Sequence, residues 1–439
     1  MNLAQARECM VKVGKYEIVK ELGCGATSTV FLALDPFNQQ QVALKVFNLN
    51  NLRDASKAKA YRKLLLTEAS LAGKLSHPHI VKIYDAVMEG EVNYMVMEYV
   101  EGETLEKYGE VDHLMDLGHI AEIIYKCCKA LEYAQYQGVT HRDIKPANIL
   151  LCGENDIKIT DFGAAAIENQ QSTQVSGVGS PAYMSPEQIK EQPLTHQTDI
   201  YSLGVTMYRL LTGKLPFDAV NSYSMIYQIM NIDPQPPSTF RPEIPRELDA
   251  IVLRAMCKDT QLRYQTWDEF ARELVAFIST NVPQQNEIFD TEKFGTLRAL
   301  SFFKNFSDVE LWEVLRISEW IKVANEETVL REGDTGQHFF VIANGSVRVI
   351  KEGRLLSLLH RGDCFGEMAH LSGKDARRST DVITKTEVTL IDIDPEVLSR
   401  GSANCRYQFG EAFLEILVKR LSMANTRISR LLKDHGDEQ

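Results

Sequence analysis

The segment "HRDIKPANIL", His141 to Leu150, places three chemically useful side chains within six residues of one another. They are the carboxylate of Asp143, the ammonium of Lys145 and the amide of Asn148, and a further carboxylate, Asp161, follows in "DFG". Phosphoryl transfer requires an acceptor aimed at the phosphoryl group and cations that neutralise the developing charge. Asp143 can orient the acceptor hydroxyl and Lys145 can meet a γ-phosphate, while Asn148 and Asp161 offer hard oxygen ligands to Mg²⁺.

Two strand-like runs, "YEIVKEL" and "STVFLAL", enclose a glycine-containing stretch, "GCGATSTV", at positions 23–30. A dinucleotide-binding loop would open a helix, so this context excludes a dinucleotide fold. The backbone amides of a glycine hairpin can close over a triphosphate because no side chain blocks them. Many hairpins carry the same pattern for turn geometry alone, so the stretch by itself is a weak indication of phosphate binding.

Lys45 lies within an apolar strand-like run, "VALKV". A buried lysine needs an anion nearby, because desolvation penalises the ammonium. Nucleotide phosphates would serve, together with a carboxylate that holds the side chain. Glu68, in the helical run "AYRKLLLTEASLAGKL", is the only glutamate between Lys45 and Tyr84 and is the expected partner.

Taken in order, these residues resemble the signature set of the protein kinases. The resemblance covers residues 14–278, and Lys145, two residues after Asp143, resembles the serine/threonine branch. It implies an α+β bilobal fold and ATP- and Mg²⁺-dependent phosphate transfer to serine and threonine hydroxyls of protein substrates. No catalytic position is lost, which favours an active enzyme over a silent kinase fold. The matching residues are Gly23, Gly25, Val30, Lys45, Glu68, His141, Arg142, Asp143, Asn148, Asp161, Phe162, Gly163 and, with serine for the usual alanine, Ser185, Pro186 and Glu187.

The same resemblance implies a role for each of several further residues. Asp199 and Arg263 resemble structural anchors of the C-terminal lobe, and Ser180 keeps the hydroxyl of the usual threonine. Arg142 resembles the arginine that pairs with a phosphorylated activation loop, where a phosphate adds about −1.5 to −2 charge and can order the loop. The implied catalytic residues are Asp143, Lys145, Lys45 and Glu68; the metal ligands Asn148 and Asp161; the ATP-binding residues Leu22, Gly23, Gly25, Val30, Ala43, Lys45, Met97, Glu98 and Tyr99; and the candidate phosphosites Ser172, Thr173 and Ser176.

A second region alternates strand-like runs with glycine turns and contains "GDCFGEMAHLSGKDARRST" at 362–380. Over residues 296–436 it resembles the cyclic nucleotide-binding domain, an all-β barrel with flanking helices. An inward arginine can bind a cyclic phosphodiester through charge-assisted hydrogen bonds, and helix-start amides add dipolar attraction. Glu367 can accept a hydrogen bond from a ribose 2′-hydroxyl, whereas Ser379 leaves cAMP and cGMP undecided. The implied binding residues are Gly366, Glu367, Met368, Ala369, Arg378 and Ser379.

The last predicted helix carries apolar residues at heptad spacing. This stripe could pair two chains as a short coiled coil, giving a homodimer, or it could pack on the barrel. The residues are Leu414, Leu417, Leu421, Ala424, Ile428 and Leu431. No DNA-binding helix-turn-helix follows it, so a transcription factor is not favoured.

The composition is that of a soluble globular protein, and the length of 439 residues predicts two or three domains. A polar linker at 279–295 separates the two regions described above. The formal charge of −12 over 439 residues argues against general affinity for nucleic acid or anionic lipid. No apolar run is long enough to span a bilayer, and the first residues lack the apolar core of a signal peptide. The eight scattered cysteines fit a reducing compartment. A cytoplasmic location is therefore expected.

These patterns together favour a serine/threonine kinase whose activity depends on a cyclic nucleotide bound to the same chain. Ligand can change activity only if its affinity differs between two states of the protein. Two alternatives stay open: a constitutive kinase whose degenerate barrel serves dimerisation or targeting, and a ligand-sensing scaffold with an inactive kinase fold. The family usually has a proline before the binding arginine, and Arg377 replaces it here. This departure supports the alternative of a degenerate barrel.

Overall fold

The computed structural model describes residues 12–25, 28–47, 73–87, 92–153, 155–162, 166–167, 181–281, 288–368 and 377–436. Backbone contacts divide the chain into two compact units, Met1–Gln284 and Gln285–Gln439, with the division inside the expected linker. Helix α8 ends at Asn281 and helix α9 begins at Asp290, so both extend into the 279–295 range. The exact domain boundaries stay a prediction.

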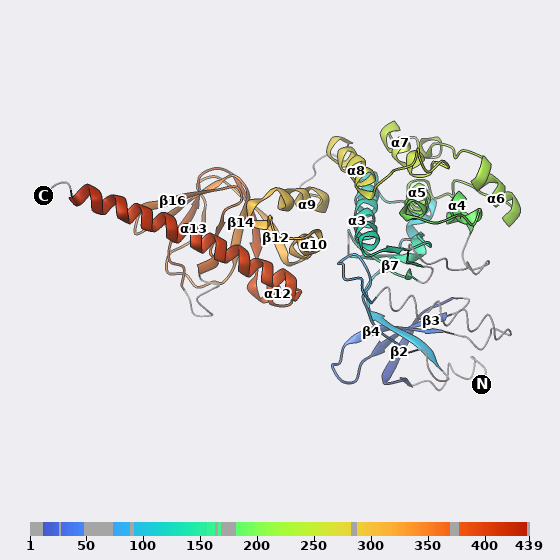
Figure 1. The fold of residues 1–439 in the computed structure, drawn as a ribbon, viewed down its shortest axis with the longest axis horizontal. Coiled ribbons are helices and arrows are strands. Elements are labelled where there is room, and N and C mark those ends of the chain that lie inside the picture. The colour runs from blue at the N-terminus through green and yellow to red at the C-terminus, as the bar shows by residue number, and fades with distance from the viewer. Residues whose placement is uncertain are drawn as a thin grey trace. The chain divides into compact units, whose positions relative to one another are not determined.

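The first unit begins with an antiparallel sheet in the order β1-β2-β3-β4-β6-β5. Strands β2, β3 and β4 of this sheet are labelled in Figure 1. Side chains alternate across this sheet, so Val42, Leu44 and Val46 enter one apolar cluster while Ala43 and Phe47 enter another on the opposite face. Lys45 shares the face of Ala43 and Phe47. The strands are β1 (Lys12–Val13), β2 (Tyr16–Cys24), β3 (Ser28–Leu34), β4 (Gln41–Phe47), β5 (Ile83–Val87) and β6 (Asn93–Glu98).

The rest of this unit is mainly helical, and its centre is α3, which packs against α5 and α8. Asp116 caps the start of α3, Thr195 caps the start of α5, and Gly213 ends α5 in the left-handed conformation at φ 71°. The helices are α3 (Leu117–Tyr136), α4 (Pro186–Ile189), α5 (His196–Thr212), α6 (Ser222–Asn231), α7 (Arg246–Ala255) and α8 (Trp267–Asn281). The short strands are β7 (Glu103–Thr104), β9 (Ile149–Cys152) and β10 (Asp156–Ile159) in one sheet, and β8 (Val139–Thr140) with β11 (Ala166–Ile167) in another.

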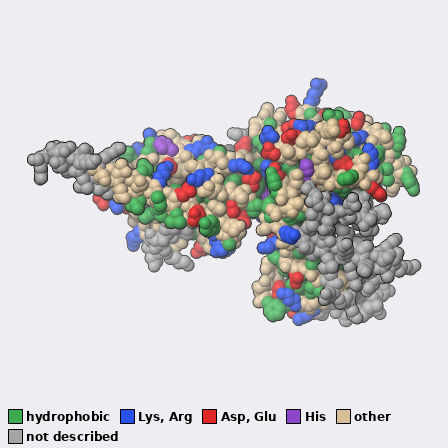
Figure 2. Space-filling model, viewed as in Figure 1, with side chains coloured by type: hydrophobic (Ala, Val, Ile, Leu, Met, Phe, Trp, Pro, Cys, Tyr) green, Lys and Arg blue, Asp and Glu red, His purple; other side chains and the backbone are tan. Residues whose placement is uncertain are grey.

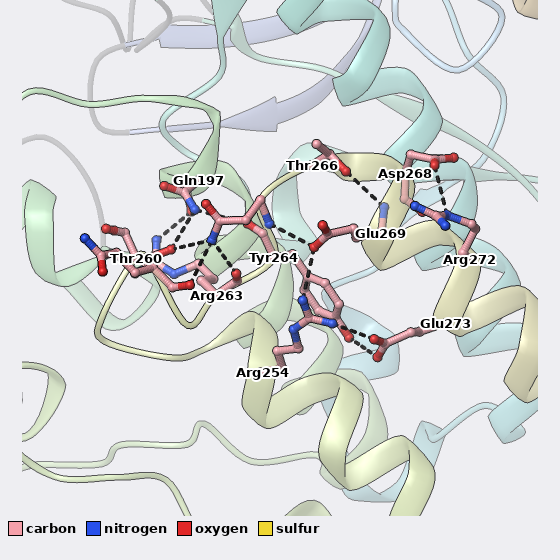
Figure 3. Close-up of polar contacts among 12 residues, drawn as sticks. Gln197, Arg254, Thr260, Arg263, Tyr264, Thr266, Asp268, Glu269, Arg272 and Glu273 are labelled. Atoms are coloured by element: carbon pink, nitrogen blue, oxygen red, sulfur yellow. Dashed lines mark hydrogen bonds and ion pairs between the residues drawn. The ribbon is translucent and has the colours of Figure 1, made fainter.

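A polar network joins α7, α8 and the segment between them (Figure 3). Arg254 of α7 donates to Glu269 and Glu273 of α8 at 3.0 and 2.6 Å, and the Tyr264 hydroxyl donates to Glu273 at 2.6 Å. Burial and the Glu273 carboxylate raise the pKa of Tyr264 well above its ordinary value, so it stays a donor. The network fixes the backbone around Arg263, one of the expected anchors.

The second unit is built on two four-stranded sheets, β12-β19-β14-β17 and β13-β18-β15-β16. The two sheets share one apolar core, and the unit is an all-β barrel as expected. This core includes Phe340, Ile342 and Leu390 from the first sheet and Val347 and Val382 from the second. The strands are β12 (Ser318–Val323), β13 (Thr328–Leu330), β14 (Phe339–Asn344), β15 (Ser346–Lys351), β16 (Arg354–His360), β17 (Cys364–Phe365), β18 (Asp381–Thr384) and β19 (Val388–Ile393).

Helices precede and follow the strands of the barrel in the sequence. The longest of the described helices in this unit is α13, which extends beyond the barrel (Figure 1). Phe409 and Phe413 of α13 are buried and meet Phe339 of the barrel, with ring centroids 5.8 and 5.0 Å away. The helices are α9 (Asp290–Ala299), α10 (Asp308–Ile317), α12 (Pro395–Ser399) and α13 (Ala403–Gly436).

The expected heptad stripe of this helix does not form a single buried face. Leu414 and Leu421 are 58% and 63% exposed, while Leu417 is half-buried. The helix packs on its own unit through Phe409 and Phe413 instead, two buried aromatic residues four positions apart on one face of the helix. The side chains of Ile428 and Leu431 lie outside the described residues.

Charged side chains of both signs are interspersed on the face shown in Figure 2. None of the helices in the described ranges is long and apolar enough to cross a membrane. Cys127 and Cys128 are buried in α3, and burial raises the pKa of the Cys127 thiol to about 12, so these thiols are packing residues.

Candidate functional site

The turn that leads into the catalytic-loop motif is held by the carboxylate of Asp199, at the start of α5. Asp199 accepts from the backbone N–H groups of His141 and Arg142, each at 2.7 Å. Arg142 adopts φ 68°, which a side-chain-bearing residue adopts only at a cost that neighbouring contacts must offset. Burial raises the pKa of Asp199 despite these donors and the nearby His141. Its role is therefore to hold the turn, as the sequence resemblance implied.

Asp143, Lys145 and Asn148 form one hydrogen-bonded group after this turn. The Lys145 Nζ donates to Asp143 Oδ2 at 2.7 Å. Asn148, in the single-turn 3₁₀ segment Pro146–Asn148, donates through Nδ2 to the Asp143 backbone oxygen at 2.8 Å and to Oδ2 at 3.1 Å. The Asp143 carboxylate is thus oriented through Oδ2, and Oδ1 is the oxygen that these contacts leave for an acceptor hydroxyl.

His141 connects this group to the "DFG" segment. Its Nε2 lies 3.0 Å from the backbone oxygen of Thr160, and its Nδ1 accepts from the Asp143 N–H at 3.3 Å. The His141 and Phe162 rings are 4.4 Å apart, and Phe162 is buried. These contacts place Asp161 beside the catalytic loop although 18 residues separate it from Asp143.

Lys45 of β4 forms an ion pair with Asp161. Burial alone would raise the pKa of Asp161. The positive charge of Lys45, with smaller contributions from His141 and Lys145, outweighs the effect of burial, so the pKa of Asp161 lies below its ordinary value. Asp161 adopts φ 64°, a further left-handed residue at the site. Glu68, the partner expected for Lys45, lies outside the described residues.

An apolar surface lies beside Lys45 on the same face of the sheet. Ala43 and Met97 belong to one cluster, against which Val30 and Leu150 pack. Gly23 pairs with Val30, and the Gly25 N–H donates to the Ser28 oxygen at 2.8 Å, which closes the glycine hairpin. Of the other expected ATP-binding residues, Leu22 is exposed, Glu98 ends β6 with its carboxylate 2.9 Å from Lys158 Nζ, and Tyr99 follows β6.

The "SPE" segment begins α4 and is tied to the catalytic loop. Ser185 and Gln188 form a capping box, and Gln188 Nε2 donates to the Arg142 backbone oxygen at 2.9 Å. Glu187 accepts two hydrogen bonds from the fully buried Arg263, at 2.7 and 3.2 Å. Gly163, Ser180 and the candidate phosphosites Ser172, Thr173 and Ser176 lie outside the described residues.

In the second unit a cavity of about 180 Å³ opens beside the implied nucleotide-binding residues Gly366–Met368, Arg378 and Ser379, which we call the cassette. Arg378 is 7% exposed and donates from Nη1 to the Gly366 oxygen at 3.0 Å and from Nη2 to the His338 oxygen at 2.9 Å. A guanidinium has five N–H donors, so these two bonds fix its plane and leave donors for an anion. Burial lowers the pKa of Arg378, and Asp392 and Glu367 oppose the shift.

The implied binding residues that the structure describes line this cavity. Gly366 adopts φ 85°, and a Cβ there would lie 3.0 Å from the His338 oxygen and 3.1 Å from Arg378 Nη1. Glu367, Met368 and Ser379 line the cavity, and Ala369 lies outside the described residues. The apolar lining is Leu330, Val349, Leu359, Phe365 and Val382.

Residues 16–275 match the protein kinase domain family, and they form more than half of the chain. This chain belongs to the protein kinase family. Residues 320–402 match the cyclic nucleotide-binding domain family, so the kinase carries a C-terminal cyclic nucleotide-binding domain. Both resemblances drawn from the sequence are confirmed.

The kinase is also similar to curated bacterial proteins. It is 36% identical over 282 residues to a probable serine/threonine-protein kinase of Clostridium acetobutylicum, covering 64% of this chain and 41% of that protein. It is 38% identical over 281 residues to the serine/threonine-protein kinase PknB of Mycobacterium leprae (62% and 44%), and 34% identical over 263 residues to PrkC of Bacillus subtilis (60% and 40%). The chain thus spans about two fifths of the length of these relatives.

The kinase domain contains residues suited to a divalent cation. Asn148 commits its amide nitrogen to Asp143, which leaves its Oδ1 as the atom for a metal. Asp161 contributes a carboxylate. Its Oδ1 accepts a hydrogen bond from Lys45, which leaves Oδ2 as the atom for a metal. Mg²⁺ is usually bound by one or two protein oxygens plus waters and substrate phosphates, so this donor set fits.

The structure adds two residues that sequence reasoning missed. Leu150, in the kinase domain, packs with Val30, Ala43 and Met97 and so belongs to the apolar surface beside Lys45. Its place at the end of the segment "HRDIKPANIL" was the available signal. Arg420 of α13 lines the cavity of the second domain, and no local pattern in the sequence marked it.

Proposed function

We propose that this kinase transfers the γ-phosphate of ATP to serine and threonine hydroxyls of protein substrates, and that cAMP or cGMP in its second domain regulates the transfer. The observation that carries the first part is the Asp143 carboxylate, oriented by Lys145 and Asn148 at 2.7 and 3.1 Å. The resemblance of the relatives, which are named serine/threonine-protein kinases, supports the hydroxyl acceptor. The protein substrates of the whole chain are part of the proposal.

In this mechanism Asp143 orients the acceptor hydroxyl and takes its proton as the phosphoryl group moves. Lys145, which lies against Asp143, contributes positive charge next to the transferred group. Lys45 contacts the other phosphates of ATP, and the apolar surface of Val30, Ala43, Met97 and Leu150 holds the base. Mg²⁺ held by Asn148 and Asp161 would neutralise the charge on the phosphate oxygens.

The regulatory part rests on Arg378. Its guanidinium is buried, its pKa is lowered by burial, and its two observed acceptors are neutral backbone oxygens. A cyclic phosphodiester would supply the negative charge that offsets the desolvation of this cation. Glu367, on the same cavity, would accept from the ribose 2′-hydroxyl, and the apolar lining would cover the base.

Phosphate transfer from Mg·ATP to a generic protein substrate tests this function in the full chain, with and without saturating cAMP or cGMP. Asp161→Ala is the blank. A rate change on adding nucleotide that Arg378→Ala abolishes is the expected result. Equal rates in all conditions would leave a constitutive kinase whose barrel serves targeting or dimerisation, and no transfer at all would favour a ligand-sensing scaffold.

A further inference from the structure

Arg420 is the residue through which α13 enters the cavity of the cyclic nucleotide-binding domain. The Arg420 side chain is 37% exposed, and Arg420 is only partly exposed, whereas its neighbours Lys419 and Leu421 are exposed. It lines the cavity together with Glu367 and Arg378. A side chain from the last helix is therefore part of the surface that a ligand would contact.

The guanidinium of Arg420 has two partners, both in the cassette region. Nη1 donates to Glu367 Oε1, and Nη2 donates to the backbone oxygen of Cys364. A guanidinium holds such paired acceptors in a fixed geometry that an ammonium does not reproduce. The contact therefore fixes both the place of α13 and the orientation of the Glu367 carboxylate.

Glu367 needs such a partner because its side chain is 1% exposed. A buried carboxylate is costly unless a cation or several donors accompany it. Its second oxygen, Oε2, lies 3.9 Å from the Cys364 thiol, which is only a weak donor. Oε2 is therefore the oxygen open to a stronger donor, and the 2′-hydroxyl of a ribose is such a group.

We propose that Arg420 is a positioning residue for ribose recognition: it holds the Glu367 carboxylate in the orientation in which Oε2 accepts the 2′-hydroxyl of a cyclic nucleotide. The inference rests on the proposed ligand class. It makes α13 part of the ligand site, because the ribose and the helix then share one carboxylate. Ligand occupancy and the anchoring of α13 are coupled through this carboxylate.

The test compares cAMP and cGMP with their 2′-deoxy analogues, using calorimetric affinities for the full chain. The wild-type protein is expected to bind the ribonucleotide at least about tenfold more tightly than the deoxy analogue, since a hydrogen bond to a charged group is lost. Arg420→Gln is expected to remove this preference by weakening the ribonucleotide to the level of the deoxy analogue. Arg420→Lys, which keeps the charge but cannot hold both acceptors, is expected to show an intermediate preference.

Lys419→Gln is the matched control, because it removes the same charge from the neighbouring exposed position of α13 and leaves the cavity unchanged. Hydrogen exchange of α13 amides gives a second readout: nucleotide should slow exchange in the wild type and in Lys419→Gln but not in Arg420→Gln. An Arg420→Gln protein that keeps the ribose preference, or that loses affinity equally for both nucleotides, overturns the inference. Failure of the wild type to bind any of the four nucleotides overturns the ligand class itself, and the inference with it.

Discussion

The Arg263 guanidinium donates two hydrogen bonds to the Glu187 carboxylate, at 2.7 and 3.2 Å, in a site where Arg263 has no exposed surface. Breaking such a buried pair leaves one charge uncompensated. We expect Arg263→Ala to lower the free energy of unfolding of the kinase domain by about 3–5 kcal/mol. Denaturant unfolding of the full chain, followed by a probe in the kinase domain, measures this.

The control for this prediction is Arg272→Ala. Arg272 pairs with Asp268 at 2.9 Å, but the two side chains are 70% and 51% exposed (Figure 3). An exposed pair contributes about 0–1 kcal/mol, so this variant should unfold close to the wild type. Equal losses for the two variants would contradict the importance given to the buried pair.

The same pair predicts a response to acid. Burial favours the neutral form of Glu187, but the ion pair with Arg263 outweighs it and holds the pKa below the ordinary value of 4.5. Its stabilising contribution is therefore complete above that pH and is lost as the pH falls through the folded-state pKa. Glu187→Gln should reduce the slope of unfolding free energy against pH, below about pH 4.5, by up to about 1.4 kcal/mol per pH unit. An unchanged slope would count against this assignment.

Asp143→Asn tests the proposed proton acceptor. The amide keeps the shape of the side chain but cannot take a proton, so the rate of phosphate transfer should fall by about 10²- to 10⁴-fold. Affinity for ATP should stay within about threefold, since Asp143 orients the acceptor rather than the nucleotide. Asp112→Asn, at an exposed position, should leave both values unchanged.

Gly366→Ala tests whether the cavity beside the cassette is the ligand site. The residue has φ 85°, and an added Cβ would crowd the His338 oxygen and Arg378. We expect loss of cyclic nucleotide binding in calorimetry together with a stability loss of about 1–2 kcal/mol. Gly353→Ala is a matched control, because its φ is 74° and its Cβ would meet open space. That variant should lose similar stability and keep its affinity.

The exposed face of α13 predicts self-association of the kinase. Tyr407, Leu414, Val418 and Leu421 are 58–66% exposed and fall within about 60° on the helix. Their spacing fits a two-stranded coiled coil. Light scattering should give about twice the chain mass of 49.7 kDa, and Leu414→Glu with Leu421→Glu should restore the single-chain mass.

Met423→Glu provides the comparison for that experiment. Met423 is 64% exposed but lies on the opposite side of α13, so the same charge there should leave the mass unchanged. A wild-type mass of one chain at micromolar concentration would remove the dimer from consideration.

The sequence by itself determined the chemistry and its local arrangement. The motif at 141–148 already implied that Asp143, Lys145 and Asn148 act together, because a short loop cannot separate them. The alternation of a strand likewise placed Lys45 on the face of Ala43. Such features depend on near neighbours, so spacing and residue type predict them.

The tertiary structure alone decided which distant groups complete each site. Asp199 holds the turn at Arg142, Leu150 joins the surface of Met97, and Arg420 reaches Glu367 across 53 residues. The stripe on α13 was ambiguous for the same reason: its spacing fits more than one packing partner, and only the burial of Phe409 showed which face the barrel covers. Many pairings of elements satisfy one local pattern, and the packing of whole side chains selects among them.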